Sequence, residues 1–280
     1  MVTGVQVKNS WDVEVEQGKR FEFGQNWVLF LNALDEGRIA IAEQSLRDML
    51  GVETLSGKRF LDIGSGSGLF SLVARRLGAT VYSFDYDPQS VACTAELKRR
   101  YFTDDAEWTV EQGSVLDAGF LASSGTFDIV YSWGVLHHTG AMWQALENAG
   151  MRVADGGTLF ISIYNDQERA SRSWKVVKRA YNSLPHSLKF LVLWPVLVWM
   201  WGPIALRDMW HGRPFATWRN YRQSRGMSAW RDVVDWVGGY PFEVAKPGEI
   251  HQFYHERGFT LAKLTTTVHH GCNQYVFVRR

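Results

Sequence analysis

The sequence predicts an α/β protein with a doubly wound, mainly parallel seven-stranded sheet, and three observations support this fold class. Short apolar runs alternate with helical patterns between Leu55 and Tyr164, and strands separated by helices form parallel sheets. A glycine-rich turn joins the first of these strands to a helix. Residues 260–267 and 274–278 read as two strands with no helix between them. They predict an antiparallel hairpin that closes the sheet after a helix at 247–257.

Residues 1–54 predict helices packed outside the sheet. Aromatic side chains come first, and an amphipathic helical pattern follows them. The apolar positions of that pattern are Ile39, Ala42, Leu46, Met49 and Leu50. We expect this segment to form a helical layer separate from the core at 55–164.

Residues 60–85 read as a strand, a glycine turn, a helix and a second strand that ends in a carboxylate. The apolar run from Phe60 to Ile63 leads into a turn with three alternate glycines. These are Gly64, Gly66 and Gly68. Glycine has no Cβ, so the backbone can turn sharply there and approach a ligand closely. The next strand ends at Asp85, where a carboxylate can bind the hydroxyls of a ribose.

The spacing of the glycines discriminates between nucleoside ligands. A dinucleotide fingerprint is G-x-G-x-x-G, whereas this turn is G-x-G-x-G and position 69 is leucine. Nicotinamide cofactors are therefore disfavoured. No Lys-Ser or Lys-Thr pair follows the glycines, so a Walker-type phosphate cradle is excluded.

Three further motifs follow in order. A strand at 108–112 leads into the loop Gly113–Asp117. A strand beginning near Thr126 leads to two adjacent histidines. A glycine turn at 155–157 leads into a strand that ends at Tyr164. Together with the glycine turn, these motifs resemble class I S-adenosylmethionine-dependent methyltransferases. The resemblance covers 55–164 closely and 249–280 more loosely, and it implies a Rossmann-like core.

The resemblance implies S-adenosylmethionine as the cofactor and a set of residues around it. The loop after the third strand would border the adenine, and the segment beginning at Trp133 and Gly134 would meet the methionine part. The implied cofactor-binding residues are Asp62, Gly64, Ser65, Gly66, Gly68, Asp85, Tyr86, Ser114, Val115, Leu116, Trp133 and Trp27. The N-terminal helices of the family often roof the cofactor, so Phe21, Asn26 and Trp27 are candidates for contact at the sulfonium end. Plain packing is the alternative for these side chains.

Methyl transfer is an in-line displacement at a carbon that positive sulfur already activates, so few catalytic side chains are obligatory. A hydroxyl or thiol acceptor benefits from a base, and histidine suits that role near neutral pH. The candidate catalytic residues are His137, His138 and Tyr164, with His137 preferred as the base. Tyr164 and Tyr240 are candidates to bind the acceptor. The alternative is that the histidines only cap a helix or hydrogen-bond within the core.

Residues 165–246 predict a helical insertion rich in tryptophan, before a C-terminal helix and hairpin at 247–280. The tryptophans are Trp174, Trp194, Trp199, Trp201, Trp210, Trp218, Trp230 and Trp236. The run from Phe190 to Leu206 is almost wholly apolar. Prolines interrupt it and it falls short of the roughly 20 residues of a spanning helix, so we expect no transmembrane helix. Two interpretations remain open: a buried helical hairpin over the active site, or a surface that enters a membrane or meets a partner subunit.

Composition limits the binding partners, cellular location and metal ligands that we expect. The formal net charge of +1 provides no general field for nucleic acid. Two cysteines are too few for a disulfide framework, and residues 1–20 contain no apolar signal core, so we expect a cytoplasmic location. His269, His270 and Cys272 lack the spacing of a zinc site, and we expect no metal.

The acceptor is expected to be a small molecule. The segment after the fourth strand lacks the Asn- or Asp-Pro-Pro-Tyr run of enzymes that methylate amino groups of nucleic acid bases. Its Val-Leu-His-His stretch is similar to small-molecule methyltransferases, among them the quinone-biosynthesis O-methyltransferases. The leading hypothesis is methylation of a hydroxyl or thiol. The alternatives are a membrane-associated enzyme acting on a lipidic quinol and a non-catalytic cofactor-binding interaction module. The oligomeric state is not predicted.

Overall fold

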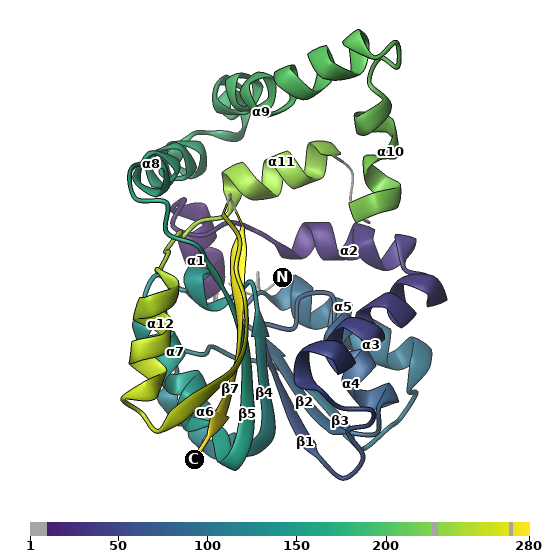
Figure 1. Ribbon diagram of the computed structural model, residues 1–280, viewed down its shortest axis with the longest axis vertical. Coiled ribbons are helices and arrows are strands. Elements are labelled where there is room, and N and C mark those ends of the chain that lie inside the picture. Colours follow the sequence, from purple (N-terminus) through teal and green to yellow (C-terminus); the bar gives the residue numbers. More distant parts are fainter. Residues whose placement is uncertain (1–9, 226–228, 269–270) are drawn as a thin grey trace, which may run out of the picture. The chain divides into compact units, whose positions relative to one another are not determined.

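The alternating pattern folds into one seven-stranded sheet in the computed structural model, which describes residues 10–225, 229–268 and 271–280 (Figure 1). The strands are β1 (Arg59–Ile63), β2 (Thr80–Asp85), β3 (Trp108–Gln112), β4 (Phe127–Trp133), β5 (Val153–Tyr164), β6 (Phe259–Thr265) and β7 (Cys272–Arg279). Their order in the sheet is β3-β2-β1-β4-β5-β7-β6. The first five are parallel, and β7 runs antiparallel to both β5 and β6. The predicted fold class is confirmed.

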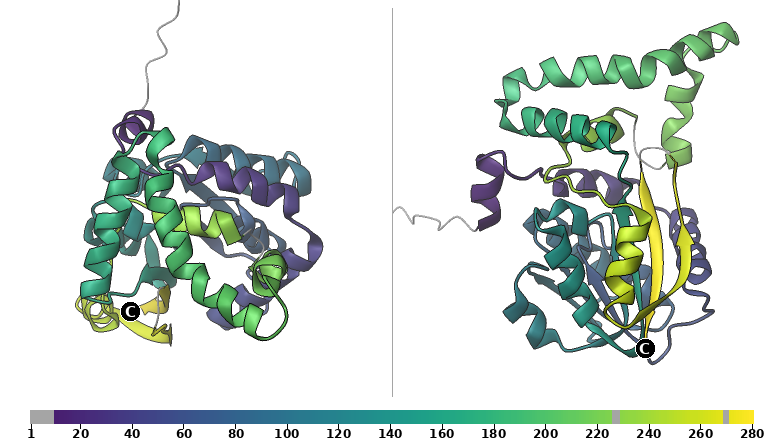
Figure 2. Two further views of the ribbon diagram at one scale, coloured as in Figure 1. Left: turned by 90° about the horizontal axis from the view of Figure 1, so that it is seen from above. Right: turned by 60° about the vertical axis from the view of Figure 1, so that its left-hand side comes forward.

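Helices cover both faces of the sheet, as a doubly wound fold requires (Figures 1 and 2). One face packs on α2 (Gly24–Ala33), α3 (Glu36–Leu50), α4 (Leu69–Arg76) and α5 (Pro88–Tyr101). The other packs on α6 (Ala118–Ser124), α7 (Met142–Met151) and α12 (Pro247–His255). Phe60 and Leu61 enter opposite layers, because successive side chains of a strand point to opposite faces.

The register brings the carboxyl ends of the central strands to one edge. Ile63 pairs with Phe84, Asp85 with Gln112, and Trp133 with Ser162. Ligands of open α/β sheets bind at this edge, near the point where the strand order reverses. Here that point lies between β1 and β4.

The chain forms two compact units, and their boundaries differ from the predicted domains. Residues 23–171 and 243–280 make the sheet unit, whereas residues 10–22 join 172–242 in a helical unit. The predicted N-terminal layer at 1–54 is therefore divided between the units. The insertion is also shorter than 165–246, because Asn165 bridges Ala245 beside the sheet.

The helical unit contains α1 (Ser10–Glu16), most of α8 (Arg169–Ser183), α9 (Phe190–Trp210), α10 (Ala216–Arg225) and α11 (Ala229–Gly238), which Figure 2 shows from two sides. Tryptophans join these helices. Trp174 of α8 lies 5.7 Å from Trp199 and 5.3 Å from Trp236, measured between ring centroids. The expectation of a buried hairpin is wrong for α9, because most of its large apolar side chains are exposed.

Candidate active site

The glycine turn between β1 and α4 has the backbone conformation that the sequence predicts. Gly64, Gly66 and Gly68 have φ of +76°, +56° and +80°, values that favour glycine. The backbone N–H groups of Gly64 and Ser65 both donate to the carbonyl of Phe84, at 2.9 and 3.1 Å, which ties the turn to β2.

Protein side chains lie against each of these glycines. A Cβ at Gly64 would fall 2.4 Å from Val135, and one at Gly68 would fall 2.9 Å from the backbone of Thr94. A Cβ at Gly66 would lie 3.1 Å from the indole of Trp27. Gly64 and Gly68 therefore allow close packing of the turn on protein atoms, and Gly66 lies under the Trp27 indole of α2.

Asp85 lies at the end of β2 and holds the turn. Its Oδ2 accepts a hydrogen bond from Gly66 N–H and its Oδ1 accepts one from Asp87 N–H, both at 2.9 Å. Each carboxylate oxygen can accept a further hydrogen bond, so the group fits the hydroxyls of a ribose. Burial raises the pKa of Asp85 to about 6, although these N–H donors oppose the shift.

Asp62 lies beneath the turn in a network of buried polar groups. Its carboxylate accepts a hydrogen bond from the Ser71 hydroxyl at 2.5 Å, and Ser71 lies 2.7 Å from the hydroxyl of Ser83. The indole N–H of Trp108 donates to Ser83. Burial raises the pKa of Asp62 to about 7. The side chain is only 2% exposed, so its observed partners are protein groups, and its part in cofactor binding remains a prediction.

The other predicted cofactor residues lie around the same edge. Ser65 shares a hydrogen bond of 2.9 Å with the hydroxyl of Thr94, and the Ser114 hydroxyl accepts one from Leu116 N–H. Val115 is buried, and its carbonyl accepts from Asn148. The Tyr86 carbonyl accepts from the Gln112 side chain. These contacts fix the loop that the resemblance assigns to the adenine.

The three predicted catalytic residues come together at the ends of β4 and β5. The ring centroids of His137 and Tyr164 are 4.0 Å apart, and those of His137 and His138 are 4.5 Å apart. His138 also lies 5.0 Å from the ring of Phe23. His137 is fully buried and His138 is 8% exposed, so both imidazoles are shielded from bulk water.

The sequence analysis missed the residues that hold this cluster. Glu243 N–H donates to the carbonyl of His137 at 3.0 Å, and the Glu243 carboxylate accepts from Met142 N–H at the start of α7, also at 3.0 Å. Ala245 N–H donates to the carbonyl of Tyr164. The sequence analysis named only Tyr240 in this part of the chain, because no local pattern marks a contact between segments so distant in sequence.

Space remains beside the cluster. Gly134 has φ of +76°, and among the described residues other than its two chain neighbours no heavy atom lies within 4 Å of the place where its Cβ would be. Trp133 next to it is 47% exposed. The glycine turn, the Asp85 carboxylate at the end of β2 and the exposed Trp133 fit S-adenosylmethionine as a donor.

Some predicted residues are not part of this cluster. Phe21 and Tyr240 belong to the helical unit, where Phe21 N–H donates to the Tyr240 carbonyl at 3.0 Å. Asn26 is buried in the sheet unit. His269 and His270 lie outside the described residues, and within the described ranges no group of three His, Cys, Asp or Glu side chains could hold a metal ion.

The fold and site together define a Rossmann-like enzyme that binds a nucleoside cofactor at the switch point of its sheet. Residues 35–230 match the methyltransferase domain family, and the chain belongs to this family, whose cofactor is S-adenosylmethionine.

Individual relatives agree with this assignment. The ubiquinone biosynthesis O-methyltransferase of Parvibaculum lavamentivorans is 32% identical over 124 residues, which are 42% of this chain and 45% of that protein. The enzyme of the same name from Rhizobium johnstonii is 27% identical over 129 residues, or 46% of this chain and 50% of that one. The chain thus spans about half the length of the curated relatives it matches.

Solved structures share the fold. Magnesium protoporphyrin IX methyltransferase from Synechocystis PCC 6803 with bound S-adenosylhomocysteine has a TM-score of 0.52 at 15% identity, covering 87% of this chain and 84% of that one. An O-methyltransferase family protein from Burkholderia thailandensis also has a TM-score of 0.52, at 12% identity, covering 84% of this chain and 55% of that one.

Proposed function

We propose that this protein transfers a methyl group from S-adenosylmethionine to a hydroxyl or thiol of a small-molecule acceptor. The observation that carries the proposal is the cluster of His137, His138 and Tyr164 at the strand ends next to the glycine turn. Val135 links the two features, because it precedes the histidines and packs on Gly64.

S-adenosylmethionine, when bound, supplies a methyl group activated by its sulfonium. The glycine turn and Asp85 would hold its nucleoside part, and Trp133 and Trp27 would offer aromatic faces to the sulfonium cation. His137 accepts the acceptor's proton on a ring nitrogen as the nucleophile attacks, and His138 is the alternative base. Tyr164 orients the acceptor beside the histidines. Burial of the two imidazoles would exclude bulk water from the proton transfer.

Oxygen is the preferred nucleophile of the acceptor. The curated relatives are named as O-methyltransferases of ubiquinone biosynthesis. A lipidic quinol is the second candidate acceptor, and the exposed apolar helix α9 favours it over a freely soluble phenol.

The test is formation of S-adenosylhomocysteine by purified protein. The acceptor panel would contain simple phenols, quinol precursors with and without an isoprenoid tail, hydroxy acids, small thiols and RNA. We expect turnover with a phenol or quinol. Turnover confined to thiols would mean that the nucleophile of the acceptor is sulfur and not oxygen. Cofactor binding without turnover on any acceptor would favour a non-catalytic binding module, and absence of cofactor binding would overturn the proposal.

A further inference from the structure

Helix α9 exposes a large apolar surface. No charged residue occurs from Phe190 to Leu206, and the helix that contains this run has 21 residues. Its exposed large side chains are Phe190, Leu191, Trp194, Val198, Trp199, Leu206, Met209 and Trp210. Leu191, Trp194 and Val198 recur at the spacing of one helical face. A soluble monomer rarely leaves so continuous an apolar surface in water.

The rest of α9 packs within the helical unit. Trp201 lies 4.6 Å from Trp218 of α10, measured between ring centroids. Leu193 is buried. These contacts explain why the helix is apolar on all sides: one side joins its neighbours, and the other remains exposed.

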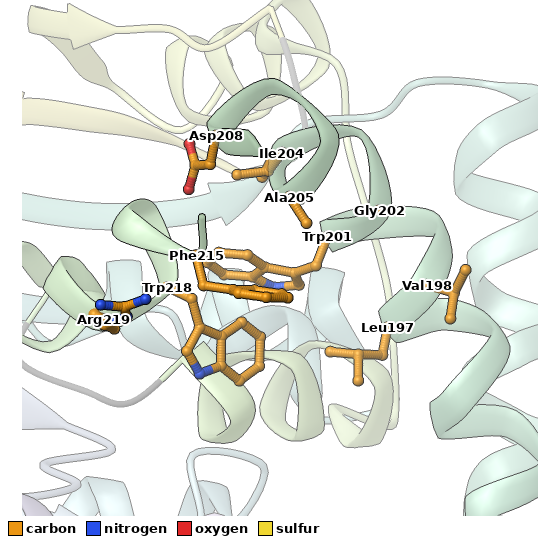
Figure 3. Close-up of a pocket in the computed structure, with 10 residues that line it drawn as sticks. All are labelled: Leu197, Val198, Trp201, Gly202, Ile204, Ala205, Asp208, Phe215, Trp218 and Arg219. Atoms are coloured by element: carbon orange, nitrogen blue, oxygen red, sulfur yellow. The ribbon is translucent and has the colours of Figure 1, made fainter. Parts of the chain in front are cut away.

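An apolar groove of about 580 Å³ extends this surface between α9 and α10. In Figure 3 the rings of Trp201, Phe215 and Trp218 gather along it. Among the described residues that line it, only Asp208 and Arg219 are charged. Phe215 is 53% exposed, so the groove opens toward solvent at that ring. Its walls suit a hydrocarbon chain.

The helical unit that carries the apolar surface is rich in positive charge. Residues 172–242 contain eleven Lys and Arg against three Asp and no Glu, a net charge of +8, whereas the entire chain has +1. Lys189 directly precedes the apolar run and Arg207 directly follows it. Exposed basic side chains also lie on α8, at Arg172, Lys175 and Arg179. An anionic lipid surface matches both the charge and the apolar face.

The chain topology determines whether α9 can span a bilayer. By length and composition alone, residues 186–210 are sufficient to cross a membrane. The apolar run at 190–206, on which the sequence analysis relied, is shorter than the roughly 20 residues of a spanning helix. However, β5 precedes α9, and β6 and β7 follow it in the same sheet. Both ends of α9 must therefore lie on one side of the membrane. No second candidate span exists among the described residues, so α9 cannot cross.

We propose that α9 lies in the plane of an anionic phospholipid bilayer. Its exposed face enters the acyl region, an acyl chain fills the groove beside Trp218, and the flanking Lys and Arg side chains bind headgroup phosphates. This docking is independent of methyl transfer, because it uses only residues of the helical unit.

The test is sedimentation of the full-length protein with vesicles of phosphatidylcholine alone or containing phosphatidylglycerol. We expect binding to the anionic vesicles, weaker binding to neutral ones, and loss of binding as salt is raised. The double variant Leu191→Glu/Val198→Glu should bind at least tenfold more weakly. The matched control is Ile41→Glu/Met151→Glu, which places two charges on exposed apolar positions of the sheet unit and should bind like the wild type.

Depth-dependent quenching by brominated lipids provides a second measurement on the unmodified protein, in case the α9 variant fails to fold. Tryptophan fluorescence should be quenched by bromines near the headgroup and not by bromines at the bilayer centre.

Absence of vesicle binding by the wild type, or equal binding by both double variants, would overturn the proposal. A dimer that covers α9 and does not bind lipid would also overturn it. S-adenosylhomocysteine binding by the same samples separates this outcome from failure of the proposed function.

Discussion

The rings of His137 and Tyr164 lie with their centroids 4.0 Å apart, although one follows β4 and the other ends β5. The contact arises because β4 and β5 are parallel neighbours whose carboxyl ends share an edge of the sheet. Glu243 and Ala245 then fix the backbones of both residues. The proposed base and the proposed acceptor-binding ring thus come from separate strands.

Replacement of His137 by Gln should slow turnover about 10²- to 10⁴-fold, the usual contribution of a positioned general base. Affinity for S-adenosylhomocysteine should stay within about twofold, because the nucleoside site remains intact. Single-turnover rates and calorimetric titration would measure the two effects. His138→Gln is the matched control. If His137→Gln retained full activity and the control lost it, the base would be His138.

Replacement of Trp27 by Ala should weaken cofactor binding roughly 5- to 30-fold, since an aromatic face near a sulfonium is worth about 1–2 kcal/mol. Trp27→Phe should recover part of that affinity. Leu29→Ala, at an exposed position of the same helix, should have no effect. Tighter binding by Trp27→Ala would instead mean that the indole obstructs the site above Gly66.

Cofactor affinity should decline as the pH falls below about 6. Burial raises the pKa of Asp85 to about 6, and its protonated form is a poorer acceptor for ribose hydroxyls. Asp85→Asn should bind about 10- to 100-fold more weakly at pH 8, and its affinity should change less between pH 5 and 8. Titrations with S-adenosylhomocysteine across this range would test both statements. Equal pH dependence in the two proteins would assign the titration to another group.

Asp62 should make the protein less stable as the pH rises from about 4 to 7. Its folded-state pKa of about 7 lies above the unfolded value of about 3.9, so folding favours the protonated carboxyl. The stabilisation of the folded state by protonated Asp62 is complete below the pKa of the unfolded state. It is lost as the pH rises through the pKa of the folded state. Asp62→Asn, which resembles the protonated acid, should therefore unfold at a temperature less dependent on pH. Thermal melts at pH 5, 6 and 7, compared as differences from the wild type, would isolate this group from other titrating residues.

Local patterns were sufficient to predict the sheet and the conformation of the glycine turn. Strand alternation, glycines at positive φ and the carboxylate at Asp85 are consequences of short stretches of sequence, and the structure places them as expected. The adjacency of His137 and Tyr164 also follows from strand order. In contrast, Val135 against Gly64 and Glu243 against Met142 join distant segments, and no local signal predicts them.

The sequence by itself determined the fold class, the family resemblance and the position of the glycine turn, because backbone sterics and hydrophobic periodicity act over a few residues. The tertiary structure alone decided which apolar residues are covered. The run at 190–206 has the composition of either a buried helix or a surface helix, and burial depends on the neighbours that the rest of the chain supplies. Those neighbours cover one side of α9 and leave Leu191, Val198 and Leu206 exposed.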